Sequence, residues 1–100
     1  MRIYTDIMNE SHDALRRRQE RLKAQIQEAL DLLQGSLHKN PSQRGFHLTT
    51  KVDQKTVTKY VRAEWVPRVR RMTANHLKVR RLLQRLSEVN WRVLQGPPPN

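Results

Sequence analysis

A heptad pattern through residues 65–95 is the feature that most constrains the fold. Its core positions alternate between spacings of three and four residues, which is typical of one helix face packing along another helix. These positions are Trp65, Val69, Met72, His76, Val79, Leu83, Leu86, Asn90 and Val93. No glycine interrupts residues 65–95, and Pro67 lies in the first turn, where a missing N–H costs little. The pattern predicts a helix over about residues 64–95.

A second, weaker heptad series precedes this one and ends at Gly35, as a helix followed by a C′ glycine would. Its positions are Met8, His12, Leu15, Gln19, Leu22, Ile26, Ala29 and Leu33. A helix over about residues 5–34 would be about 45 Å long, matching the later helix at about 1.5 Å per residue. In an antiparallel arrangement one register satisfies both series, with Leu22 opposite His76 and Gln19 opposite Val79.

The segment between the two helices carries a β-hairpin signal. Residues 46–52 alternate in polarity and residues 56–62 are rich in β-branched side chains, with Asp53-Gln54-Lys55 between them. Ser36 to His38 could add a third strand. We predict a mainly α fold, an antiparallel two-helix coiled-coil hairpin with a β-hairpin tip. It would form a single domain over residues 1–95, with loop and β-hairpin over about 36–62 and a Pro-rich tail at 96–100.

Composition narrows the class of protein. The chain has 100 residues with a net charge of +11, no cysteine and few aromatic side chains. Disulfides and thiolate metal sites are therefore excluded, and a deep substrate cleft is not expected. No apolar run is long enough for a membrane span or a signal peptide, so we expect a cytoplasmic protein without a membrane partner.

The positive charge is concentrated in one half of the chain. Residues 36–85 contain 13 Lys and Arg but only two acidic residues, whereas the remaining residues are balanced. A face selected only for solubility would mix the two signs, so this bias favours binding to phosphate groups over an ordinary solvated surface. The predicted nucleic-acid-binding residues are Arg44, Lys51, Lys55, Lys59, Arg62, Arg68, Arg70, Arg71, Lys78, Arg81 and Arg85.

Several apolar residues lie outside both heptad series. Two paired helices cannot bury them all, because each helix turns only one face towards its mate. We therefore predict an interface, in a homo-oligomer or with a larger protein partner. The predicted interface residues are Leu30, Leu32, Leu77, Leu82, Val89, Trp91 and Leu94.

Motifs for catalysis are missing from the sequence. The four histidines have no zinc spacing, and the chain has no Gly-rich phosphate loop and no nucleophile elbow. We expect no enzymatic activity, no cofactor and no metal.

Three short segments resemble a small bacterial domain family of unknown function. They are Leu33-Gln34-Gly35-Ser36-Leu37, Tyr60-Val61 at the end of the hairpin, and the run over residues 82–90. The resemblance implies a helix, a Gly-Ser-Leu entry, a β-hairpin and a long C-terminal helix, with a loose association to mobile elements. Many relatives carry a Cys-rich, metal-knuckle-like insert, where this chain has Asn40-Pro41-Ser42-Gln43-Arg44-Gly45.

These patterns together predict a small basic accessory protein that binds DNA or RNA. It would grip the phosphate backbone through the second helix and the β tip, as a subunit of a nucleoprotein assembly or as a homo-oligomer. The alternative is a protein-binding adaptor or inhibitor that docks its basic face on an acidic partner. The choice between DNA and RNA, the sequence specificity, the partner, the oligomeric state and the role of the tail stay open.

Overall fold

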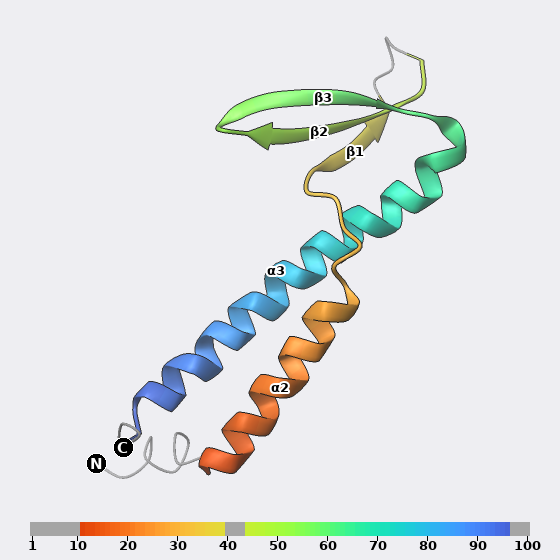
Figure 1. Cartoon of the computed structure of the whole chain (residues 1–100). Helices are drawn as coiled ribbons and strands as arrows, with labels where there is room; N and C mark the ends of the chain where they lie inside the picture. The colour runs from red at the N-terminus through yellow and green to blue at the C-terminus, as the bar shows by residue number, and fades with distance from the viewer. Residues whose placement is uncertain (1–10, 40–43, 97–100) are drawn as a thin grey trace. The chain divides into compact units, whose positions relative to one another are not determined.

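The computed structural model describes residues 11–39 and 44–96 (Figure 1). The predictions that concern residues 1–10, 40–43 and 97–100 lie outside the described residues. These are the first turns of the early helix with Met8, the middle of the loop and most of the Pro-rich tail. The described elements are α2 (His12–Glu28), β1 (Ser36–Lys39), β2 (Phe46–Val52), β3 (Lys55–Val61), η1 (Ala63–Trp65) and α3 (Val66–Leu94).

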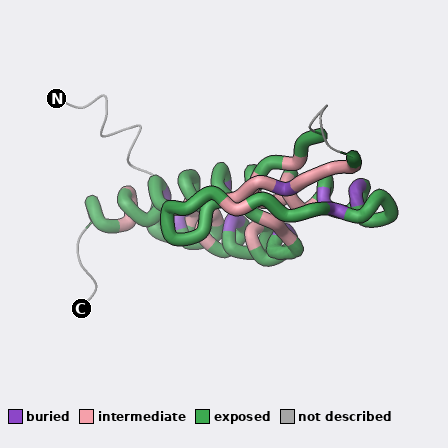
Figure 2. The backbone as a smooth tube through the Cα atoms, turned by 90° about the horizontal axis from the view of Figure 1, so that it is seen from above, coloured by how far each residue is buried: buried purple, intermediate pink, exposed green. Residues whose placement is uncertain are grey.

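The chain divides into two compact units, each with its own apolar cluster. Among the described residues, the helical unit comprises 11–28 and 80–96, and the sheet unit comprises 29–39 and 44–79. Helix α3 contributes its first turns to the sheet unit and its later turns to the helical unit. In Figure 2 the buried residues are short purple segments of the backbone, and the other described residues are half-buried or exposed.

The helical unit packs α2 against the later turns of α3. Helix α2 begins after Ser11, whose Oγ accepts a hydrogen bond from the backbone N–H of Ala14 at 3.1 Å, as an N-cap does. The buried core residues recur every seven positions on each helix: Leu15 and Leu22 on α2, Leu82 and Val89 on α3. Ile26, Leu86 and Val93 pack around them.

The sheet unit contains an antiparallel sheet in the order β1-β2-β3, so that β1 and β3 are its edges (Figure 1). Strands β2 and β3 are joined by Asp53 and Gln54, which both have positive φ. Two such residues between paired strands make a type I′ turn, the turn whose twist matches that of a hairpin. The hairpin predicted from alternation is therefore confirmed, and Ser36 does open a third strand.

One face of the sheet packs on the first turns of α3. Leu48 and Val61 are buried with Val66 and Val69 of α3, and Leu33, Leu37 and Phe46 complete the cluster. Since side chains alternate between faces along a strand, these sheet residues share one face, which we call the covered face. The opposite face has no buried residue.

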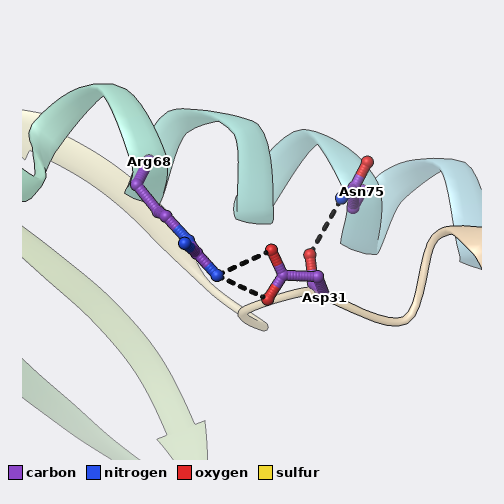
Figure 3. A network of polar contacts seen from close by, with 3 residues as sticks. All are labelled: Asp31, Arg68 and Asn75. Atoms are coloured by element: carbon purple, nitrogen blue, oxygen red, sulfur yellow. Dashed lines mark hydrogen bonds and ion pairs between the residues drawn. The ribbon is translucent and has the colours of Figure 1, made fainter.

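Residues 29–35 link α2 to β1 and are held by α3 through a small polar network (Figure 3). The carboxylate of Asp31 accepts from Nη2 of Arg68 at 3.2 and 3.3 Å, and its backbone carbonyl accepts from Nδ2 of Asn75 at 2.8 Å. The backbone N–H of Leu33 also donates to the carbonyl of Met72 at 3.1 Å. The link is therefore fixed to α3 by backbone as well as side-chain bonds.

The predicted fold class is wrong. The structure is not a two-helix coiled-coil hairpin: a short helix, a three-stranded sheet and a long helix follow one another along the chain. Helix α2 has 17 residues and ends at Glu28, whereas α3 has 29, so the two helices are not matched in length. The physical reason lies in the link, because Asp31 and Leu33 bond to α3 where the prediction continued the first helix to residue 34.

Gly35 is also not a helix C-cap. It precedes β1 with φ +144°, and a Cβ built on it would lie 2.7 Å from the backbone oxygen of Thr49. The residue is a glycine because the link passes too close to β2 for any side chain.

The predicted helix over residues 64–95 agrees with η1 and α3. Six of its nine predicted heptad positions are buried or half-buried: Val69, Met72, His76, Val79, Leu86 and Val93. The other three positions are wrong. Leu83, Asn90 and Trp65 are exposed, Leu83 at 50% and Trp65 at 51%. Leu82 and Val89 are buried instead, at 5% and 4%. Gln19 lies beside Asn90, to which its Nε2 donates at 2.7 Å, and not opposite Val79. The predicted register is therefore wrong.

Candidate nucleic-acid interface

The candidate site begins with the uncovered face of the sheet, which we call the open face. Register places its residues in rows across the strands, because cross-strand partners project to the same side. One row is His38, His47 and Tyr60, the next is Ser36, Thr49 and Thr58, and beyond them Lys51 pairs with Thr56. All eight residues are exposed or half-buried.

The first row is a continuous run of rings, with one ring from each strand. His38 stacks on His47 with 6.3 Å between ring centroids, and Tyr60 meets His47 edge-on at 5.7 Å. A hydrogen bond joins Nε2 of His38 to Oγ1 of Thr49 in the neighbouring row. Tyr60 stays 64% exposed, and the buried Nδ1 of His47 has no hydrogen-bond partner among the described residues.

The sheet unit also carries a strong excess of positive charge. Residues 29–79 contain ten Lys and Arg against Asp31, Asp53 and Glu64, a net charge of +7. The unit holds nine of the predicted nucleic-acid-binding residues, and all nine are exposed. They are Arg44, Lys51, Lys55, Lys59, Arg62, Arg68, Arg70, Arg71 and Lys78.

The hairpin supplies three of these cations. Lys51 lies on the open face, whereas Lys55 and Lys59 lie on edge strand β3, at positions that share a side with the covered face. Lys55 and Lys59 nevertheless remain exposed. Their ammonium groups can reach solvent because a lysine stem can lie along apolar surface while its charge stays in water.

Two of the predicted arginines on α3 have intramolecular contacts. Arg68 forms the ion pair with Asp31 (Figure 3), and the guanidinium of Arg70 lies 5.2 Å from the centroid of the Phe46 ring. Arg71 and Lys78, seven residues apart on α3, make no ion pair among the described residues. Arg71 and Lys78 are therefore the better candidates on α3 for a phosphate.

Arg81 and Arg85 belong to the helical unit, so the predicted set is divided between the two units. Arg85 lines a pocket of the helical unit together with Arg18, Arg21 and Arg92, with Glu88 as the acidic member. Arg18, Arg21 and Arg92 are not among the predicted nucleic-acid-binding residues. Arg92 follows Arg85 by seven residues, so the sequence does carry a signal for it.

The predicted interface residues fall into two groups. Leu82 and Val89 pack inside the helical unit and so do not contribute to an exposed apolar surface. Leu30, Leu77, Trp91 and Leu94 are exposed by half or more, and Leu32 is half-buried. Trp91 and Leu94 line a second pocket of the helical unit.

The described residues bring no three His, Cys, Asp or Glu side chains together in a group that could hold a metal ion. No helix among the described residues is long and apolar enough to cross a bilayer.

Comparison with protein-family models, with curated proteins and with solved structures gave no match to this chain. The resemblance to the small bacterial family therefore stays a prediction.

Proposed function

We propose that this chain is a small basic accessory protein that binds nucleic acid, mainly by contacts between the sheet unit and phosphate groups. One observation carries the proposal: eight of the nine predicted cations of the sheet unit make no ion pair among the described residues. Unpaired, exposed cations at this density repel one another, and a polyanion relieves that repulsion. Arginine forks add bidentate bonds to phosphate oxygens.

A salt titration tests this proposal. Binding of the full chain to labelled duplex DNA, single-stranded DNA and structured RNA would be followed by fluorescence anisotropy between about 50 and 200 mM salt. Each phosphate that is neutralised releases counterions, so the logarithm of the association constant falls linearly with the logarithm of salt concentration. With several contacts we expect the affinity to fall by about a hundredfold or more over that range. A flat dependence, or no binding at low salt, would overturn the proposal.

The second candidate is a protein-binding adaptor, for which the helical unit offers one observation. Trp91 and Leu94 are 61% and 71% exposed, and phosphate binding uses neither side chain. Aromatic residues of this kind are common anchors in protein interfaces. A stable protein complex that survives nuclease treatment, combined with no affinity for polynucleotides, would favour the adaptor over the nucleic-acid binder.

A further inference from the structure

We propose that the open face of the sheet is a stacking platform for unpaired bases, so that the ligand is single-stranded nucleic acid. This inference rests on the proposed function and adds the ligand class and the surface that recognises it. The shared chemistry is an unpaired nucleobase, whether it comes from DNA or from RNA.

The ring row carries the inference. His38, His47 and Tyr60 are cross-strand partners, and their ring centroids lie 6.3 and 5.7 Å apart in order from β1 to β3. Bases stack on aromatic side chains, and every base has a π-face, so such a row accepts bases of any sequence. Tyr60 keeps 64% of its surface exposed at the edge of the sheet, where an incoming base can reach its ring.

Gly45 is a second, independent feature of this row. A Cβ built on Gly45 would lie 2.8 Å from Cε1 of Tyr60, and its φ is +78°. The absence of a side chain there lets the tyrosine ring rest against the backbone just before β2. The ring is thus positioned by the backbone without being covered.

The central histidine gives a third observation. Nδ1 of His47 is buried and lacks a hydrogen-bond partner among the described residues. An unpaired buried polar atom is costly in a folded protein and calls for an explanation, such as strain, an ordered water or a functional role. His47 is the middle residue of the ring row, so this unpaired atom belongs to a residue of the open face.

The rest of the open face suits the sugar and phosphate groups that accompany each base. Thr49 and Thr58 supply hydroxyls in the adjoining row, and Lys51 supplies a positive charge beyond them. A duplex would use these groups less well, since its bases are stacked on one another and their faces are not available. A single strand can place bases on the rings and its backbone along the hydroxyls and the lysine.

The test compares full-length variants in binding to an oligothymidylate, an oligouridylate and a duplex of equal length at one salt concentration. Tyr60→Ala should weaken binding of both single strands by about tenfold or more and leave duplex binding nearly unchanged. Tyr60→Phe, which keeps the ring, should bind like the wild type. Trp65→Ala is the matched control, because Trp65 is a similarly exposed aromatic residue of the sheet unit outside the open face.

A second measurement does not depend on any substitution. Photo-crosslinking of a single strand containing 5-iodouracil, followed by peptide mapping, should label the peptides that hold His47 and Tyr60. Crosslinks found only outside the open face would overturn the platform, as would equal losses for single strand and duplex in Tyr60→Ala or no loss at all. In those cases the proposed function survives if the wild type still binds polynucleotides with a steep salt dependence. If the wild type binds none, both fail.

Discussion

Gln19 and Asn90 are joined by a hydrogen bond of 2.7 Å from Nε2 to Oδ1 within the helical unit. The bond lies beside the core formed by Leu15, Leu22 and Val89. A polar pair next to an apolar seam favours one register, since any sliding of the helices leaves two amides without each other. This pair therefore helps to specify the register of α2 against α3.

The side of α3 that is buried can be tested with two neighbouring leucines. Leu82→Ala removes a side chain that is only 5% exposed and should lower the free energy of unfolding by about 2–4 kcal/mol. Leu83→Ala changes a side chain that is 50% exposed and should cost less than about 1 kcal/mol. Urea denaturation followed by circular dichroism would measure both. A larger loss for Leu83→Ala would contradict the core described here.

Glycine substitutions test the close approach of the link to β2. Gly35→Ala should cost about 2 kcal/mol or more, because φ is +144° and the new Cβ would meet the backbone oxygen of Thr49. Gly96→Ala is the matched control, since a Cβ there meets its nearest atom at 3.6 Å, an ordinary contact. Thermal unfolding of the two variants should differ clearly. Equal melting curves would show that the link does not pass so near the strand.

The hairpin turn offers a stabilising substitution. Gln54 has φ +67°, a conformation that costs a residue with a Cβ roughly 1–2 kcal/mol. Gln54→Gly removes most of that cost and completes an Asp-Gly pair, which type I′ turns favour. We expect a gain of about 1 kcal/mol in chemical denaturation. A loss of stability would mean that the turn has another geometry.

Salt dependence should respond to the number of cations in the interface. Lys51→Gln combined with Lys55→Gln should lower the slope of log affinity against log salt by about two, one for each lost phosphate contact. Lys23→Gln is the control, because Lys23 lies in the helical unit and pairs with Glu20 at 3.4 Å. An unchanged slope in the double variant, or the same decrease in the control, would remove the hairpin from the proposed interface.

Local patterns predicted the strands and the long helix well. Alternation over residues 46–52 matches β2 residue for residue, and β3 and α3 differ from the predicted ranges by one or two residues. These elements are determined by side chains close in sequence, namely a turn between two alternating runs and a heptad pattern without breaks.

The end of the first helix was not predictable in this way. Ala29 and Leu33 fit a helical period, and Gly35 stands where a C-cap glycine would. The link instead bonds to Arg68, Met72 and Asn75, which are more than thirty residues away in sequence. Tertiary bonds of this kind override local preference and leave no periodic signal.

The prediction of the buried side of α3 is correct at most heptad positions and wrong at Leu83, for a simpler reason. Leu82 and Leu83 are equally apolar, and so the spacing of apolar residues alone allows either one to face α2. The exposure of the nine cations in the sheet unit followed from their charge. The full row of three rings could not be predicted in the same way. It depends on the register between β1 and β2, and a strand at Ser36 to His38 was only one possibility in the sequence.

Strand β3 is an edge strand with no second partner strand among the described residues, and it carries Lys55 and Lys59. Positive side chains on an outer strand discourage another chain from adding itself by main-chain pairing. Lys55 and Lys59 would therefore serve solubility as well as binding, and removing both charges would expose a template for β-aggregation. Bound nucleic acid would neutralise the same lysines. It would then have to cover the edge of β3 itself, in place of the charges, to prevent pairing with another chain.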